Sequence, residues 1–304
     1  MSRGARWLAV CALGLAACAS PPEVYEPTES YYVDQEIVFP DAGAQIERGE
    51  PIWIFDAFND YLISLPTKIL LWNRHVLDHR MSETDQRILE AYLAMNRLHS
   101  VKVRHNEYAP IDEFRRLTQN TEVGAGYRYT LGLFNWLMYT LVPDRIFAGV
   151  PIIGGGDHFN PFTNTINVYS SDVTVLLHEA GHAKDYVEHE WKGTSFALLR
   201  LLPGIDLMQE ANASSDAIRF LYCIHDEPDE VRAYHTLIPA YSTYIAGYFQ
   251  GGLIVTVPIV IAGHISGRVQ GAEREDAHEH EKDSPKSDMR PPFCVPLEDV
   301  SLDK

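Results

Sequence analysis

The sequence predicts an α+β protein in which helices dominate and a small sheet contributes a few short strands. Of its 304 residues, 46% are hydrophobic, which is enough to bury a core and excludes a globally disordered chain. Apolar residues recur at helical spacing in several segments, whereas strict alternation is confined to two short ones. The length suits one large domain or two small ones.

The charge balance excludes some partners. The chain carries 25 Lys and Arg residues against 42 Asp and Glu residues, a formal net charge of −17. A nucleic-acid partner is not expected, because a phosphate backbone requires a basic surface. The same acidity argues against electrostatic docking on anionic lipid headgroups. The oligomeric state is left open by the sequence.

Residues 1–17 have the layout of a signal peptide. Arg3 and Arg6 precede an apolar run that is too short to span a bilayer. The run ends in Leu-Ala-Ala-Cys at Cys18, which resembles the lipobox of bacterial lipoproteins. The resemblance implies a lipid anchor on Cys18 and a location in the bacterial cell envelope, facing the periplasm or the cell surface, with Ala19 favouring the outer membrane. An ordinary signal peptide with an incidental cysteine is the alternative.

Composition divides the remaining residues into three predicted segments. Residues 18–50 carry several Pro and Glu residues and are expected to form an extended tether. Residues 51–268 are expected to hold the folded domain. Residues 269–304 are acidic and are expected to be partly disordered.

Two features of the C-terminal region bear on metal binding and on crosslinking. The run Asp276–Lys282 interleaves His and Glu, and we expect a solvated charge run, with weak metal binding as the alternative.

Cys223 and Cys294 lack the spacing of a zinc site. They can pair in an oxidising compartment, which would join the tail to the folded domain.

Local patterns predict the first helix and strand of the domain. Ser82-Glu-Thr-Asp85 reads as a capping box, and apolar residues then recur at helical spacing through Met95. Val101–Arg104 alternates and predicts a short strand. Tyr129–Pro143 is apolar but only about four turns long, so a buried helix is favoured over a membrane span.

A second strand is predicted at Thr165–Tyr169, where the residues alternate between turn-forming neighbours. It lies directly before an apolar run that begins at Val173. Ser171 or Asp172 can cap the helix that this run predicts.

Residues 245–263 form an unusual apolar segment within a longer stretch, Ala233–Gly267, that contains no Asp, Glu, Lys or Arg. Its length is enough for a membrane span, but it is interrupted by Gly251, Gly252, Pro258 and Gly263. A buried helix pair or a hairpin that dips into lipid explains the same composition, and the three alternatives stay open.

The residues that carry chemistry follow the apolar run. His178-Glu179-Ala-Gly-His182 places two His side chains four residues apart, so both imidazoles emerge on one helix face. That spacing lets both reach one Zn²⁺ ion. Glu179 is rotated by about 100° from His178 and would lie beside the metal, where it can accept a proton from a bound water.

A zinc site needs a third protein ligand. The stretch Asp206–Tyr222 is rich in helix formers, and Glu210 lies 28 residues after His182, which is room for a loop and a returning helix. Glu210 is therefore the predicted third ligand, with Asp206 and Asp216 as alternatives.

An HExxH helix followed by a Glu-bearing helix resembles the gluzincin metallopeptidases, in particular the compact core of membrane-associated proteases of the HtpX type. The resemblance covers roughly Val101–Tyr222. It implies a zincin-like fold, a Zn²⁺ cofactor, and a peptide or protein substrate aligned on an edge strand, here Thr165–Tyr169. The family usually has an Asp four residues after the Glu ligand. Here that residue is Ser214, so Asp216, Ser214 and Asp206 are all candidates to orient a zinc ligand.

The motif and the resemblance together imply a membrane-tethered zinc endopeptidase of the bacterial cell envelope. A zinc-activated water would attack the peptide bond, with Glu179 as the general base. Two alternatives stay open, namely a non-catalytic zinc-binding envelope lipoprotein and a zinc amidohydrolase acting on a non-peptide envelope substrate. The candidates for stabilising the oxyanion are Tyr186, His235, Tyr241 and Tyr244.

Overall fold

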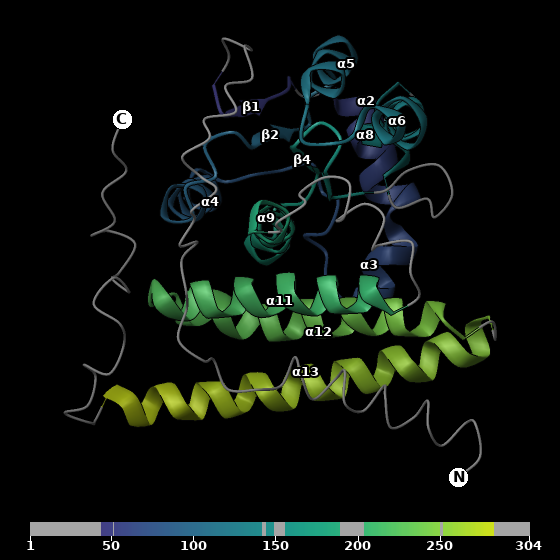
Figure 1. The fold of residues 1–304 in the computed structure, drawn as a ribbon. Coiled ribbons are helices and arrows are strands. Elements are labelled where there is room, and N and C mark those ends of the chain that lie inside the picture. Colours follow the sequence, from purple (N-terminus) through teal and green to yellow (C-terminus); the bar gives the residue numbers. More distant parts are fainter. Residues whose placement is uncertain are drawn as a thin grey trace. The chain divides into compact units, whose positions relative to one another are not determined.

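The fold is that of a computed structural model of the chain. The structure describes residues 44–50, 52–141, 144–148, 156–188, 204–249 and 252–282. Helices dominate these residues and a single small mixed sheet accompanies them, which confirms the α+β class (Figure 1). The chain divides into two compact units, Pro27–Pro203 and Gly204–Lys304, the latter counted together with Met1–Glu26. The predicted domain of residues 51–268 includes parts of both.

The first unit holds the sheet. Its elements in chain order are β1 (Ile46–Arg48), α2 (Trp53–Phe58), η1 (Asn59–Ile63), α3 (Leu65–Leu71), α4 (Glu83–Met95), β2 (Lys102–His105), α5 (Pro110–Gln119), α6 (Ala125–Tyr127), η2 (Arg128–Gly132), α7 (Leu133–Asn135), η3 (Trp136–Leu141), α8 (Asp144–Phe147), β3 (His158–Asn160), β4 (Thr165–Val168) and α9 (Val173–Glu188). The three η segments are π-helical turns.

The four strands run in the order β1-β2-β4-β3. β1, β2 and β4 are parallel, and β3 is antiparallel to β4. Figure 1 shows α4 and α9 on one side of this sheet and α5 on the other. Covered on both faces, β2 is buried at all four positions. The strand predicted at Val101–Arg104 is thus confirmed, but its charged residues do not face solvent.

Two cations of β2 are paired inside the unit. Lys102 Nζ lies 2.5 Å from Glu47 of β1. Arg104 bonds the same Glu47, and its Nε donates to Glu113 Oε1 of α5 at 2.7 Å. Buried charges are tolerated when they are paired in this way. Glu47 belongs to the predicted tether, so the end of that segment is part of the sheet.

The strand expected at the sheet edge is an inner strand, which corrects the sequence-based prediction. β4 pairs with β2 on one side and with β3 on the other, so the edge is β3. The hairpin that joins β3 to β4 ends at Asn164, which adopts a left-handed φ of 52°. With three residues, β3 is too short to show an alternating pattern, so sequence periodicity did not predict it.

The capping box is confirmed. Ser82 Oγ accepts from the Asp85 backbone N–H at 3.0 Å, and Asp85 Oδ2 accepts from the Ser82 N–H at 3.0 Å. The first turn of α4 therefore has two of its free donors satisfied. The apolar face that follows is buried, as the helical spacing predicts: Ile88, Leu89, Tyr92 and Leu93.

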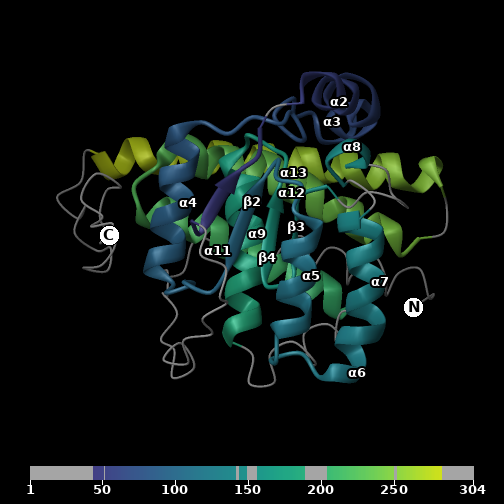
Figure 2. The same cartoon turned by 90° about the horizontal axis from the view of Figure 1, so that it is seen from above.

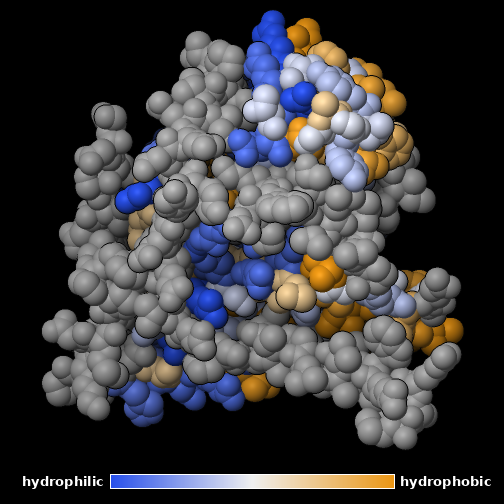
Figure 3. Space-filling model, in the orientation of Figure 1, coloured by the Kyte–Doolittle hydropathy of each residue, from blue (hydrophilic) through white to orange (hydrophobic). Residues whose placement is uncertain are grey.

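The helix predicted at Tyr129–Pro143 is present through Leu141, but it is not a buried helix. Gly132 is where it packs, since a Cβ there would lie 2.8 Å from Leu117 and 2.9 Å from Phe162. Trp136 also packs against this core cluster, whereas six other apolar side chains of the helix are exposed: Tyr129, Leu131, Leu133, Phe134, Leu137 and Leu141. In Figure 3, apolar side chains reach the surface around α5 and α6. Apolar composition predicted the helix but not which side of it would be covered.

The second unit is helical. Its described elements are α11 (Ile205–Cys223), α12 (Glu227–Gly247) and α13 (Leu253–Lys282), which lie alongside one another in Figure 1. α13 approaches α12 closely at glycines, and a Cβ at Gly263 would lie 2.5 Å from Ser242 Oγ. The predicted helix Asp206–Tyr222 is confirmed as α11.

The run Asp276–Lys282 is not a solvated charge run throughout, because it continues α13 and buries His278. The fully buried Glu230 of α12 accepts from His278 Nε2 at 2.9 Å and from Arg274 Nε at 2.8 Å. Arg274 and His278 are four residues apart and share a helix face. This charged cluster links α12 to α13.

The apolar segment 245–263 forms the end of α12 and the start of α13, with Gly252 in a left-handed conformation between them. It is a helix pair, although the start of α13 is exposed at Leu253 and Ile254. Figure 3 shows apolar side chains at the surface in the region where α12 ends and α13 begins. Among the described helices, Leu253–His280 is long and apolar enough, by length and composition, to cross a membrane.

Cys223 is buried and disulfide-bonded. Cys294, its predicted partner, lies outside the described residues. So does Cys18, and lipidation there stays a prediction.

His105 gives the first unit a pH-dependent stability. It is buried at the end of β2, and its pKa is lowered from 6.5 to about 4, chiefly by burial and then by the charge of Arg48. His79 and Arg145 lower it further, and a backbone hydrogen bond at Arg80 opposes them. Between these two pKa values the unfolded chain binds a proton that the folded chain does not. The free energy of unfolding therefore falls as the pH drops from 6.5 towards 4, by about 3 kcal/mol in all.

We expect His105→Gln to flatten this dependence, because Gln does not titrate. Denaturant unfolding at pH 7 and pH 5 measures it, and the parent should lose about 2 kcal/mol more than the variant between the two. His280→Gln, at an exposed position of α13, is the control and should follow the parent. Equal losses in parent and His105→Gln would contradict the assignment.

Candidate metal centre

The helix that carries the HExxH motif begins at a well-defined cap. Asp172 Oδ1 accepts from the Thr174 backbone N–H at 3.0 Å and from Thr174 Oγ1 at 2.7 Å. Asp172 is thus the cap of α9. Ser171, the other candidate, instead donates to Asp78 Oδ2 at 2.7 Å.

The turn between β4 and α9 is tied to the start of the hairpin. Asp157 Oδ1 accepts from the backbone N–H groups of Tyr169 and Ser170, at 2.6 and 3.0 Å. Burial raises the pKa of Asp157, and the hydrogen bonds from Ser170 and Tyr169 oppose that shift. Through its carboxylate, Asp157 therefore joins the start of β3 to the turn that follows β4.

Side chains of α5 hold the hairpin from the other side. Arg116 Nε donates to the Thr163 carbonyl at 2.9 Å, and its Nη2 donates to the Asn164 carbonyl at 2.9 Å. Asn120 Nδ2 donates to the carbonyls of Pro161 and Phe162, at 3.1 and 2.9 Å. These bonds satisfy the buried carbonyls of the hairpin, and they hold β3 in place against α9.

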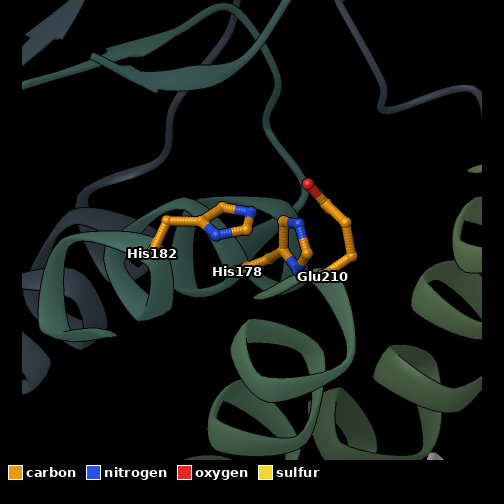
Figure 4. Close-up of side chains that lie close together, drawn as sticks. All are labelled: His178, His182 and Glu210. Atoms are coloured by element: carbon orange, nitrogen blue, oxygen red, sulfur yellow. The ribbon is translucent and has the colours of Figure 1, made fainter. Parts of the chain in front are cut away.

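The predicted ligands are close together. His178, His182 and Glu210 each offer one ligand atom, and these atoms all lie within 4.8 Å of one another. The two imidazole rings are 4.7 Å apart between centroids and nearly perpendicular, at 80°. In Figure 4 the two rings and the Glu210 carboxylate point toward a common space. All three residues are buried.

The donor set fits zinc in kind and number. Two imidazoles and one carboxylate are the three protein ligands of several catalytic zinc sites, which leave a fourth position for water or substrate. Within the part of the chain that the structure describes, this is the one group of three or more His, Cys, Asp or Glu side chains close enough to share an ion. No Cys belongs to the group, so it lacks the usual fourth ligand of a structural site.

Glu179 is held by the edge strand. The backbone N–H of Phe159 in β3 donates to Glu179 Oε2 at 2.8 Å, and the Glu179 side chain is 8% exposed. The Phe159 ring packs edge-on against Tyr186 of α9, with 5.4 Å between centroids. Phe159 is a site residue that sequence reasoning missed, because only the hairpin geometry brings it to α9.

The candidates for orienting a ligand lie at different points of α11. Asp206, in the first turn, accepts from the Gly204 N–H at 3.1 Å and from the Tyr248 hydroxyl. Asp206 therefore makes its hydrogen bonds at the start of α11. Ser214 lies one turn after Glu210 and is buried, whereas Asp216 is half-buried two residues further on.

The four candidates for stabilising the oxyanion also lie at different places on the helices. Tyr186 is buried on α9, and burial raises the pKa of its hydroxyl. His235 is half-buried on α12, and its pKa is lowered by burial and by Arg268. Tyr241 is buried and Tyr244 is exposed. None of the four is assigned a role.

Searches of protein-family models, curated proteins and solved structures find no match to this chain. The functional argument therefore rests on the site and on the elements that build it.

Substitution of a predicted ligand should abolish zinc binding while the fold is kept. We expect His182→Ala and Glu210→Gln each to weaken binding by more than the roughly 10–100-fold that loss of an outer hydrogen-bond partner costs. Zinc titration by calorimetry after chelation measures this. His280→Ala, an exposed imidazole of α13, is the control and should bind as the parent does. Parent-like zinc binding by both ligand variants would remove these residues from the site.

Proposed function

We propose that the protein is a zinc metallopeptidase of gluzincin type, tethered to a membrane of the bacterial cell envelope and acting as an endopeptidase. The single observation that carries the proposal is the buried group of His178, His182 and Glu210, with Glu179 next to His178 on the same helix. The envelope location rests on the lipobox that ends at Cys18.

The residues of the site divide the chemistry between them. His178, His182 and Glu210 would hold zinc, which supplies Lewis acidity for the scissile carbonyl and for water. Glu179 accepts the proton of the attacking water and passes it to the leaving amine. Burial at 8% exposure keeps this carboxylate away from bulk water, so it acts where electrostatic interactions are strong.

An extended substrate would add to β3, the edge strand, rather than to β4. A peptide that pairs with the outer side of β3 finds the Phe159 N–H already bonded to Glu179. A substrate carbonyl that takes over this N–H leaves a Glu179 oxygen available for the proton of the attacking water. Substrate alignment and activation of the base are then linked through one backbone group.

Glu179→Gln should separate catalysis from metal binding. We expect kcat to fall by at least about 100-fold, because Gln cannot accept the proton, while about one zinc stays bound. The measurements are cleavage of a quenched peptide or casein, and zinc content. Glu188→Gln, at the exposed end of α9, is the matched control and should keep the parent rate.

Each result decides between the alternatives. A parent that binds zinc and leaves all peptides intact, but hydrolyses a cell-wall or lipid amide in a Glu179-dependent way, would be an amidohydrolase. A parent that binds zinc and hydrolyses neither class would be a non-catalytic zinc lipoprotein.

Two substitutions of Phe159 test the role of its backbone N–H. Phe159→Pro removes the N–H and the ring, whereas Phe159→Ala removes the ring alone. Proline is tolerated in edge strands where the N–H is outside the ladder, and here that N–H serves Glu179. We expect kcat/KM to fall clearly further in the Pro variant than in the Ala variant, with zinc content equal. Equal losses would assign the effect to the ring and its contact with Tyr186.

A further inference from the structure

One segment of the first unit exposes an unusual number of large apolar side chains. It spans residues 52–72, that is α2, η1 and α3 with their flanking residues. Trp53 and Trp72 are 75% and 76% exposed, and Ile69 is 71% exposed. The exposed set is Ile52, Trp53, Ile54, Phe55, Phe58, Tyr61, Leu62, Leu65, Ile69 and Trp72. Figure 2 shows α2 and α3 at the margin of the unit, outside the sheet and the helices that cover it.

The charges of this segment are all paired. Residues 52–72 contain three charged side chains, Asp56, Asp60 and Lys68. Lys68 Nζ bonds the Asp60 carboxylate and also donates to the Asp60 carbonyl at 3.0 Å. Arg145 donates to both carboxylate oxygens of Asp56, at 2.7 and 2.8 Å. Burial would raise the pKa of Asp56, but the hydrogen bond and charge of Arg145 outweigh it and lower the pKa.

We propose that residues 52–72 form a membrane-docking surface that lies in the interfacial region of a phospholipid bilayer. Trp and Tyr are the side chains that favour this region, and the segment exposes two Trp and one Tyr among its aliphatic residues. Large apolar side chains gathered at such exposure in one segment favour an interaction site in a folded protein. Because its charges are neutralised within the protein, the segment can leave water without burying an unpaired ion.

The charge pattern selects the kind of lipid surface. The docking segment has no unpaired Lys or Arg, and the whole chain carries a net charge of −17. Attraction to anionic headgroups is therefore not what holds it, and a zwitterionic phospholipid such as phosphatidylcholine suffices. Binding should follow apolar burial and should be insensitive to salt.

The position of the segment in the chain also favours a membrane over a soluble partner. Ile52 lies 34 residues after Cys18, the predicted lipid anchor. Ile46 at the start of β1 lies 28 residues after Cys18, and a chain of that length spans at most about 100 Å, so the docking surface can reach the bilayer that holds the anchor. The anchor alone would leave the orientation of the unit free, whereas a second contact fixes which side faces the lipid. The inference rests on the membrane tether of the proposed function and not on the proposed peptidase activity.

Quenching of tryptophan fluorescence by brominated phosphatidylcholine tests the proposal on the full chain reconstituted in vesicles. Bromine on the upper acyl chain quenches only tryptophans that enter the interface. We expect brominated vesicles to quench the parent and to lose most of that quenching with Trp53→Phe/Trp72→Phe. Trp136→Phe is the control, since Trp136 is half-buried with its Nε1 bonded to the Pro110 carbonyl at 2.8 Å. It should keep the parent response.

A second pair of variants separates this surface from the other exposed apolar helix end. Leu62→Glu/Ile69→Glu places charges on the docking surface and should reduce quenching of Trp53 and Trp72, without change in circular dichroism. Leu253→Glu/Ile254→Glu, at equally exposed positions of α13, should leave that quenching intact. Equal quenching of the parent and the Trp53→Phe/Trp72→Phe variant would overturn the proposal. So would quenching that survives Leu62→Glu/Ile69→Glu.

Discussion

The polar stripe on the buried side of α9 is the constraint on which the site depends. His178, Glu179 and His182 lie on a helix whose neighbouring residues are apolar and inaccessible to water. Polar groups in such a place are unfavourable unless they have partners. The hairpin supplies one partner, the Phe159 N–H for Glu179, and a Glu210 carboxylate oxygen lies within 4.8 Å of a nitrogen of each imidazole. Bound zinc would satisfy all three ligands together.

The hairpin in turn is held by buried polar and charged side chains elsewhere in the first unit. Arg116 and Asn120 of α5 bind its carbonyls, and Asp157 binds the turn that leads into α9. α5 is joined to β2 by the Glu113–Arg104 ion pair. The sheet is covered on both faces, so these side chains are buried. They keep one conformation in which their hydrogen bonds are satisfied. The position of the Phe159 N–H beside Glu179 therefore depends on these polar contacts of the hairpin.

The proposed membrane attachment and the proposed catalysis use different residues. The proposed docking segment contains none of the site residues, and the Asp56–Arg145 ion pair joins it to the rest of the first unit. A peptidase held at a bilayer by a flexible tether alone would sample all orientations. A second, apolar contact would restrict the unit to one orientation and would present the edge strand at a constant height above the lipid.

The sequence by itself determined three of the helices and the candidate metal ligands that two of them carry. The capping box at Ser82, the helix around His178 and the helix of Glu210 all follow from short-range periodicity and spacing, and the structure places each of them as predicted. Three features were decided by tertiary structure alone: β3 as the edge strand, the burial of His278, and the exposed side of the helix at Tyr129. Each of these features depends on which element, distant in the sequence, packs against a face of the helix or strand. Helical and strand periodicity are properties of neighbouring residues, so they fix an element and its polar face but not the partner that buries it.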